Sequence, residues 1–189
     1  MATQRERTEA TRSALLSAAR RLFLSEGFAA TTTQRLLQET GLSKGALYHH
    51  FKSKVEILEA LYTEEARCAM ERASANLNTN DPYTERLIKA CRSWLEEVQD
   101  PEVSAMLFDV GPASLGRAKA KDIEDRLSLA LFTTLLTKAT EAGEVDLPSP
   151  HLTARMLNAI IAEASIHARE TGEDHSDAVV RTLRSVLGL

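Results

Sequence analysis

The sequence has few of the residues that favour sheets and tight turns. Of its 189 residues only 5% are aromatic, and there are 8 glycines and 5 prolines. Alanine and leucine are frequent, and both favour helices. No stretch of about five residues or more alternates apolar and polar side chains, as a half-buried strand would. These absences predict an all-α fold.

Long apolar runs are also missing. A helix that spans a membrane needs roughly 18 to 20 consecutive apolar residues, and no run in this chain approaches that length. Residues 1–7 are charged and are not followed by the apolar core of a secretory signal peptide. We therefore expect a cytoplasmic protein that has no membrane partner.

Cysteine is scarce. Cys68 and Cys91 are the two cysteines of the sequence, and they are too far apart for the spacing of a zinc site or a secreted disulfide framework. We expect free, buried thiols. A redox switch between the two is the alternative.

Motifs of several enzyme classes are absent too. The sequence has no nucleophile elbow, no P-loop, no H-E-x-x-H zinc motif and no dinucleotide-binding fingerprint. We therefore predict no catalytic residue, no cofactor and no metal. One alternative stays open, a helical enzyme or metal-binding protein that uses Glu163 and His167, which are four apart on an expected helix. An ordinary ion pair also explains that spacing.

Charge is unequally distributed along the chain, although the net charge is only −4. Residues 1–54 contain nine Lys or Arg and four acidic residues, a balance of +5. The remainder contains 14 basic and 23 acidic residues, a balance of −9. A basic end on an acidic body is expected when only that end binds a polyanion such as DNA. A helical module that binds proteins alone gives no reason for this asymmetry.

The stretch 31–54 is predicted to form two short helices joined by a tight turn, followed by the start of a longer helix. Gly41 tolerates the positive φ that such a turn needs, and Ser43 is placed to cap the second short helix. Leu47 and Phe51 lie four apart and can face a core. This pattern is typical of a helix-turn-helix.

The opposite face of the second short helix carries side chains suited to DNA. Lysines bind phosphates, tyrosine and histidine can hydrogen-bond phosphates or base edges, and small residues let the helix backbone approach closely. The set consists of Ser43, Lys44, Gly45, Ala46, Tyr48 and His49, with Lys54 beyond it. The alternative is an αα-corner whose basic face is merely solvated.

Apolar periodicity predicts about nine helices in all. Ser53 and Glu56 form an S-x-x-E capping box at the start of a long one. The expected ranges outside the helix-turn-helix are 8–26, 53–75, 83–99, 102–110, a helix ending near 142, and a final pair after the loop 148–150. We expect a three-helix DNA-binding domain at 1–54, with its helix-turn-helix at about 31–51, and an effector-binding and dimerisation domain at 55–189.

The first part of the chain resembles the DNA-binding domain of the tetracycline-repressor (TetR) family. The matching pieces are Gly27-Phe28, Thr32-Thr33, Gly41 to Gly45, Leu47 to Phe51 and Ser53-Lys54. Beyond about residue 75 only the all-helical layout is similar. The resemblance implies a transcriptional regulator that binds double-stranded operator DNA, by default a repressor that a small molecule releases.

Carried over position by position, the resemblance also implies individual DNA contacts. The phosphate-binding positions are occupied by Thr33, Tyr48 and Lys54. The base-reading positions are occupied by Gln34, Lys44 and Ala46. A glutamine can pair with adenine through two hydrogen bonds, and a lysine favours guanine.

A short recognition helix reads only a few base pairs, so specificity requires two copies, with half-sites about 34 to 36 Å apart or somewhat further. The last two expected helices carry apolar stripes that suit a dimer seam, and the resemblance implies a four-helix bundle there. The candidate seam residues are Leu152, Met156, Ile160, Ile161, Ala164, His167, Val179, Leu183, Val186 and Leu187. The alternative is that these stripes close the monomer's own core.

Bulky flexible or aromatic side chains in the middle helices suit a cavity for a small-molecule effector. The candidates are Met70, Trp94, Met106, Phe108, Phe132 and Met156. Core packing is the competing explanation for each. The expected switch is a ligand that shifts the helix 53–75, changes the separation of the two recognition helices and so lowers operator affinity.

Overall fold

The computed structural model describes residues 3–189, and every regular element in that range is a helix. The elements are α1 (Gln4–Ser25), α2 (Thr33–Thr40), α3 (Lys44–His50), α4 (Lys54–Ser74), α5 (Tyr83–Glu97), α6 (Pro101–Ser104), the π-helix η1 (Ala105–Val110), α7 (Gly111–Leu115), α8 (Arg117–Glu141), α9 (Pro150–Thr171) and α10 (Ser176–Leu187). The segments α6, η1 and α7 follow one another without a gap. When they are taken as one broken helix, the described residues contain nine helices, as the sequence predicted.

The chain divides into two compact units. The first comprises residues up to Glu65 together with Ala105–Ala120, and the second comprises Ala66–Ser104 and Lys121–Leu189. Both α4 and α8 therefore contribute residues to each unit. The domain boundary expected at residue 54 falls at the start of α4, and the first unit extends past it.

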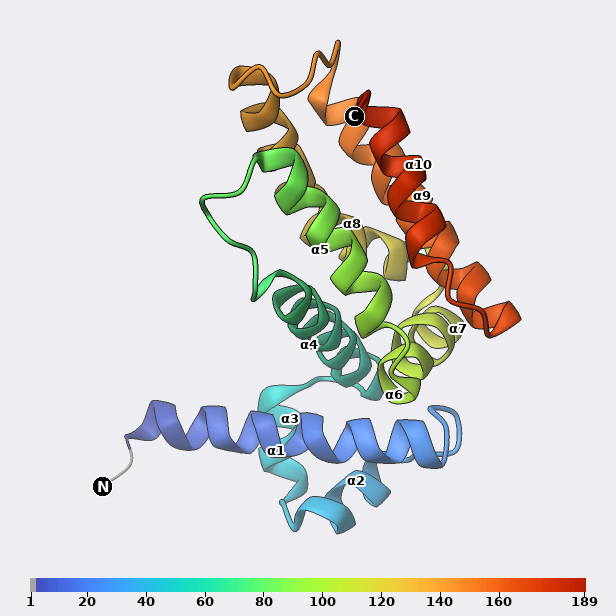
Figure 1. The fold of residues 1–189 in the computed structure, drawn as a ribbon. Coiled ribbons are helices and arrows are strands. Elements are labelled where there is room, and N and C mark those ends of the chain that lie inside the picture. Colours follow the sequence, from blue (N-terminus) through green and yellow to red (C-terminus); the bar gives the residue numbers. More distant parts are fainter. Residues whose placement is uncertain (1–2) are drawn as a thin grey trace. The chain divides into compact units, whose positions relative to one another are not determined.

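The core of the first unit lies along one face of α1. Figure 1 shows α1, in blue, running beside α2. The buried residues of this core are Leu15, Leu16, Ala18, Ala19, Leu22, Phe23, Leu36, Leu47, Phe51, Ile57, Leu58, Leu61 and Met106. Each short helix contributes one fully buried leucine, Leu36 from α2 and Leu47 from α3. The helix-turn-helix is thus anchored on α1 through few apolar contacts.

Helix α1 begins earlier than the sequence analysis expected. Thr3 caps it: the Glu6 amide donates to Thr3 Oγ1 at 3.2 Å, and the Thr3 amide donates to Glu6 Oε2 at 2.5 Å. This reciprocal T-x-x-E capping box satisfies two amides that a helix start leaves unpaired. The expected start near residue 8 was therefore too late, although the capping signal was present in the sequence.

The first unit also contains the π-helical turn η1, where the sequence predicted an ordinary helix. Tyr62 of α4 is fully buried, and its hydroxyl donates to the Leu107 carbonyl of η1 at 3.2 Å. A Cβ atom at Gly111 would lie 2.1 Å from the Tyr62 ring, far inside van der Waals contact. Only glycine at this position therefore leaves room for the ring. This contact ties η1 to the first half of α4.

In the second unit, α5, α9 and α10 pack on one another, and α8 adds to their core. Figure 1 shows α9 and α10 side by side. The shared core consists of Leu87, Cys91, Leu95, Phe132, Leu135, Leu136, Ala139, Val145, Ala154, Leu157, Ile161, Val179, Leu183 and Leu187. These residues come from all four helices, so each helix buries its apolar stripe against the others.

The start of α5 is capped by a residue distant in sequence. Pro82, at the cap position, makes no side-chain cap hydrogen bond. Instead the Glu144 carboxylate accepts hydrogen bonds from the Tyr83 amide at 2.9 Å, the Thr84 amide at 2.9 Å and Thr84 Oγ1 at 3.0 Å. Partial burial raises the pKa of Glu144, but these hydrogen bonds outweigh it and hold the pKa below its ordinary value.

Candidate nucleic-acid interface

The turn between α2 and α3 has the predicted geometry. Gly41 adopts the left-handed conformation, with φ 67° and ψ 12°, and its amide donates to the Leu37 carbonyl at 2.9 Å. Ser43 Oγ then accepts from the Ala46 amide at 3.2 Å and caps α3. Because both features depend on short-range geometry, the sequence predicted them correctly.

The side chains of α3 divide into a buried and an exposed face. Leu47 is fully buried, whereas Lys44, Tyr48 and His49 are exposed, with 44% of Tyr48 accessible to solvent. Lys44 Nζ lies 5.9 Å from the centroid of the Tyr48 ring. Ser43 and Gly45 are exposed as well, and Ala46 is half-buried. One face of a short helix therefore presents a cation, a phenol and an imidazole together.

Gly45 has no structural role within the folded chain. A Cβ atom at this position would meet only Ser43 Oγ, at an ordinary contact distance of 3.9 Å. Its backbone is helical and does not require glycine, and glycine inside a helix is less favourable than alanine. The contacts of the described residues therefore do not require a glycine at this position.

Helix α2 is capped by Thr32, whose Oγ1 accepts from the Arg35 amide at 3.1 Å. Of the two family-implied contact residues on α2, Gln34 is exposed and Thr33 is half-buried. Only Leu36 on this eight-residue helix is fully buried. Apolar packing alone therefore holds α2 weakly.

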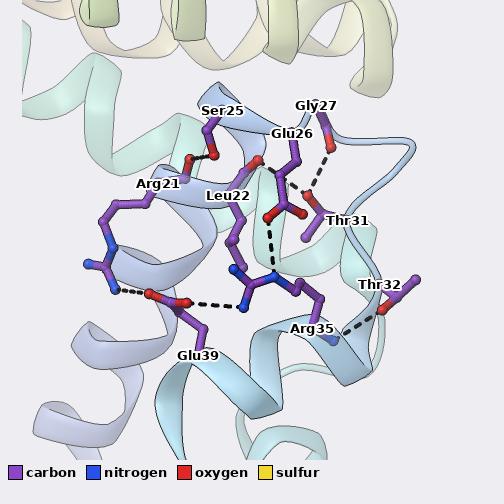
Figure 2. Close-up of polar contacts among 9 residues, drawn as sticks. All are labelled: Arg21, Leu22, Ser25, Glu26, Gly27, Thr31, Thr32, Arg35 and Glu39. Carbon is purple, nitrogen blue, oxygen red and sulfur yellow. Dashed lines mark hydrogen bonds and ion pairs between the residues drawn. The ribbon is translucent and has the colours of Figure 1, made fainter.

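A chain of ion pairs adds a second connection between α1 and α2 (Figure 2). Arg35 Nε donates to Glu26 Oε1 at 3.1 Å, and Arg35 Nη1 donates to Glu39 Oε2 at 3.1 Å. The other oxygen of Glu39 accepts from Arg21 Nη2 at 3.1 Å. We call Glu26, Arg35, Glu39 and Arg21 the α1–α2 ion-pair chain. Its charges alternate in sign and sum to zero.

The ion pairs shift the ionisation of their members. Hydrogen bonds to Glu26 and Glu39 raise the pKa of Arg35. Hydrogen bonds from Arg21 and Arg35 lower the pKa of Glu39. Both groups are thus held in their charged forms, as expected for paired opposite charges.

The loop between α1 and α2 is fixed by buried polar contacts. Thr31 is fully buried, and its hydroxyl lies 2.9 Å from the Gly27 carbonyl and 3.3 Å from the Leu22 carbonyl (Figure 2). On the other side of the loop, Lys54 Nζ donates to the carbonyls of Phe28 at 2.6 Å, Thr31 at 2.8 Å and Ala29 at 3.4 Å. The first residue of α4 therefore binds this loop directly.

These contacts give Lys54 a structural role within the first unit, in addition to the phosphate contact that the sequence predicted. An ammonium group has three donors, and all three have acceptors within the first unit. A phosphate contact would compete with these carbonyls. The structure therefore places Lys54 in the support of the interface, whereas Lys44 and Tyr48 remain on its outer face.

The capping box predicted at the start of α4 is present in modified form. The Glu56 amide donates to Ser53 Oγ at 3.1 Å, as predicted. The Glu56 carboxylate, however, accepts from the Lys52 amide at 2.6 Å, one residue before the expected donor. The Glu56 side chain therefore caps an amide in the connection between α3 and α4.

The six residues proposed to line an effector cavity fall into different environments. Met106 is fully buried in the core of the first unit, so packing accounts for it. Met156 is 52% exposed and does not line an interior. Met70, Trp94 and Phe108 are half-buried, and Phe132 is buried in the core of the second unit.

The second unit contains two polar contacts that the sequence did not predict, one of them with Trp94. Its Nε1 donates to Ser165 Oγ at 3.3 Å, and Ser165 is almost fully buried. Asn158 Nδ2 donates to Asp125 Oδ1 at 2.9 Å in the same unit. Ser165 and Asn158 lie among apolar residues of α9, and periodicity alone gives no sign of their partners.

The proposed seam residues are separated by the structure into two groups. Ile161, Val179, Leu183 and Leu187 are buried in the core of the second unit. Leu152, Met156, His167 and Val186 are exposed, and Ile160 and Ala164 are half-buried against that core. One edge of the stripes therefore closes the core of the second unit, as the alternative explanation expected, and the other edge is open to solvent.

The structure gives no support to the alternative of an enzyme or metal-binding protein that uses Glu163 and His167. Glu163 and His167 are both exposed, and His167 stacks on His175 with ring centroids 4.9 Å apart. Within residues 3–189, no group of three or more His, Cys, Asp or Glu residues is arranged to hold a metal. None of the helices there is both long and apolar enough to cross a membrane.

Both cysteines are free. Burial raises the pKa of the Cys91 thiol to about 12, so this thiol stays protonated and is a poor nucleophile. Cys68 is half-buried, with Arg67 Nη2 3.4 Å from its sulfur.

Comparison with known proteins agrees with this geometry. Residues 15–61 match the family of bacterial regulatory proteins of the tetR type, and residues 84–188 match the tetracyclin repressor-like C-terminal domain. The HTH-type transcriptional repressor AcnR of Corynebacterium efficiens is 36% identical over 91 residues, which are 48% of this chain and 42% of AcnR. The chain thus spans less than half the length of this curated relative.

Solved structures share the whole fold. A TetR-family transcriptional regulator from Pectobacterium atrosepticum is 28% identical, with a TM-score of 0.74 over 99% of this chain and 94% of its own. FadR from Bacillus subtilis, solved with stearoyl-CoA, is 19% identical, with a TM-score of 0.70 over 94% of this chain and 96% of its own. The second likeness concerns the fold alone. Together with the matches over both parts of the sequence, these findings confirm the family that the helix-turn-helix predicted: the chain belongs to the TetR family of DNA-binding transcriptional regulators, which are not enzymes.

Proposed function

We propose that this protein binds operator DNA in the cytoplasm as a homodimer, represses transcription there, and leaves the DNA when a small molecule binds its second unit. The observation that carries the proposal is the exposed face of α3. Lys44, Tyr48 and His49 point to solvent from a helix whose other face is anchored on Leu47. Such a helix can enter a major groove without disturbing its own support.

The roles of the DNA contacts follow from their chemistry. Lys44 and Gln34 are exposed and can donate to base edges, and Tyr48 can donate to a phosphate. Thr33, at the first turn of α2, supplies a second phosphate contact. The excess of basic residues in 1–54 adds attraction that does not depend on sequence.

A homodimer is supported by the outer edge of α9 and α10. Leu152 and Met156 lie one helical turn apart on α9 and are 56% and 52% exposed. On α10, Val186 is 41% exposed. Large exposed apolar side chains that gather on one surface are typical of an interface, and α9 and α10 pack on each other. A two-fold axis through this edge would pair the same patch of both copies.

An effector with an apolar body and a polar group fits the second unit. Half-buried Trp94 and Met70 offer apolar surface, and the Trp94–Ser165 and Asn158–Asp125 pairs offer polar partners inside the unit. FadR, which shares the fold, was solved with a small molecule, stearoyl-CoA. That likeness supports a ligand-binding role and leaves the ligand of this chain open.

Release from DNA requires that the effector favour one arrangement of the dimer over the other. Helix α4 is the proposed connection, because Lys54 at its start holds the α1–α2 loop while its later residues belong to the second unit. A displacement of α4 would move the support of the recognition helix.

Selection of DNA from a random-sequence duplex pool by the purified protein tests this function. We expect enrichment of a two-fold symmetric sequence, and reduced capture of it after addition of the correct effector from a metabolite library. Failure to enrich any sequence over the starting pool, or equal enrichment by a variant that lacks Lys44 and Tyr48, would overturn the proposal.

A further inference from the structure

The α1–α2 ion-pair chain occupies an unusual place for a set of charged residues. It lies in the DNA-binding unit, yet none of its four charges is free. Arg35 is next to Gln34, a proposed base-reading residue, and is the arginine of α2. Two of its guanidinium nitrogens donate to carboxylates, Nε to Glu26 and Nη1 to Glu39 (Figure 2).

The geometry of the chain constrains the rotation of α2. Arg35 lies in the first turn of this eight-residue helix and Glu39 in its last, so both ends are tied to the final turns of α1. Leu36 is fully buried and Leu37 is half-buried against the same core, and the ion pairs add a constraint at each end of the helix. Because Gln34 projects from the same turn as Arg35, a rotation of α2 would redirect Gln34 as well.

Stability is a poor explanation for the arrangement. The side chains are between 29% and 60% exposed, and exposed ion pairs contribute little to folding. Arginine is also the residue best suited to bind a phosphate through two hydrogen bonds, and here that capacity is used on carboxylates. The arrangement gives up an available phosphate contact.

We propose that the α1–α2 ion-pair chain is a specificity device: it fixes the rotation of α2 for base reading and withholds the Arg35 guanidinium from DNA phosphates. Arg35 is then a positioning residue that acts through Gln34. The two carboxylates are neutralised by their arginine partners, so they do not repel an operator. They also keep Arg35 from a phosphate contact that DNA of any sequence could provide. This inference rests on operator binding by the helix-turn-helix.

The test compares binding to the selected operator with binding to a scrambled duplex of equal length, over a range of salt concentrations. Glu39→Gln keeps the shape of the side chain and releases Arg21 and half of Arg35. We expect its affinity for scrambled DNA to rise about fivefold, with a steeper salt dependence, because a freed guanidinium adds about one phosphate contact. Affinity for the operator should not rise in parallel, so the ratio of operator affinity to scrambled-duplex affinity should fall.

Arg35→Gln tests the other half of the proposal, because it removes the guanidinium itself. Loss of the positioning contact should weaken operator binding about tenfold, the order expected for one base contact, while affinity for scrambled DNA and the salt dependence stay unchanged. Asp122→Asn is the matched control, because it removes one carboxylate from an exposed ion pair with Arg126 on α8. We expect it to leave the ratio of operator to scrambled affinity unchanged.

Two results would overturn the inference. If Arg35→Gln weakens both duplexes equally and lowers the salt slope by about 0.9, Arg35 binds a phosphate directly. If Glu39→Gln changes the ratio no more than Asp122→Asn does, the ion-pair chain has no part in specificity. Should Arg35→Gln fail to fold by circular dichroism, the comparison of Glu39→Gln with Asp122→Asn still decides, and Glu26→Gln repeats it at the other carboxylate that binds Arg35. A wild-type protein that does not discriminate between the duplexes would instead refute the proposed function.

Discussion

Lys54 Nζ donates a 2.6 Å hydrogen bond to the carbonyl oxygen of Phe28 and lies 4.2 Å from the centroid of the Phe28 ring. The first residue of α4 therefore holds the segment that follows α1, next to the start of α2. From the sequence, the lysine at this position is predicted to bind a phosphate. Its contacts in the structure join two parts of the DNA-binding unit, and the phosphate contact stays a prediction.

We predict that Lys54→Met lowers the free energy of unfolding in the absence of DNA by about 1–2 kcal/mol, because hydrogen bonds from a charged donor to three carbonyls are lost. Urea unfolding measures this change. Lys52→Met, which removes an exposed lysine nearby, should have almost no effect on stability. Unchanged stability of Lys54→Met, combined with a shallower salt dependence of operator binding, would restore the phosphate role.

The double variant Lys44→Ala with Tyr48→Ala tests the exposed face of α3. Each side chain points to solvent and makes no core contact, so folding and dimerisation should be preserved. Operator binding should weaken by about 2–5 kcal/mol in total, the sum expected for a base contact and a phosphate contact. A gel-shift titration measures this loss, with Arg126→Ala as a charge control outside the first unit. An unaltered affinity would contradict the assignment of α3 as the recognition helix.

Gly45→Ala should raise the stability of the protein and lower its affinity for the operator. Because nothing in the protomer occupies the space of the new methyl group, the helix should gain about 0.5–1 kcal/mol of stability. Operator affinity should fall, because the methyl group enters the gap that the DNA backbone would fill. Thermal unfolding and gel shifts measure the two effects.

Gly143→Ala is the contrasting control for Gly45→Ala. Gly143 has a φ of +72°, so alanine there is strained and the free energy of unfolding should fall. If Gly45→Ala binds the operator as tightly as the wild type, close approach of the DNA backbone to residue 45 is disproved.

Met156→Asp should convert the dimer to folded monomers, detected by light scattering, because it places a charge on the exposed edge of α9. Its neighbour Leu157 is fully buried, and Leu157→Asp should unfold the second unit instead. Ile160 is a less discriminating position, because it also packs against the core. Persistence of a dimer in Met156→Asp would move the seam to another surface.

Glu144→Gln should destabilise the second unit by about 1 kcal/mol at neutral pH, since a neutral acceptor replaces a carboxylate that binds three donors. Because folding lowers the pKa of Glu144, its contribution is complete above the ordinary value of 4.5 and is lost as the pH falls through the lower folded pKa. The difference between wild type and variant should therefore shrink on acidification. Urea unfolding at neutral and acidic pH measures it, and a difference independent of pH would contradict the capping role.

The sequence by itself determined the local structure and, through it, the family. The turn at Gly41, the cap at Ser43 and the spacing of Leu47 and Phe51 depend on contacts within one or two helical turns. Such short-range features are encoded by residue type and period. They sufficed to predict an all-helical chain and to place Lys44, Tyr48 and His49 on a common exposed face.

Only the tertiary structure decided which partner each residue meets. Periodicity indicates that a face is buried and not what covers it, so Ile161 and Met156 looked alike until one proved buried and the other exposed. Likewise, Lys54 finds acceptors 23 to 26 residues away. The contact between Arg35 and Glu26 depends on how α2 lies on α1. Distances across helices are set by packing of the whole unit, which no local pattern in the sequence specifies.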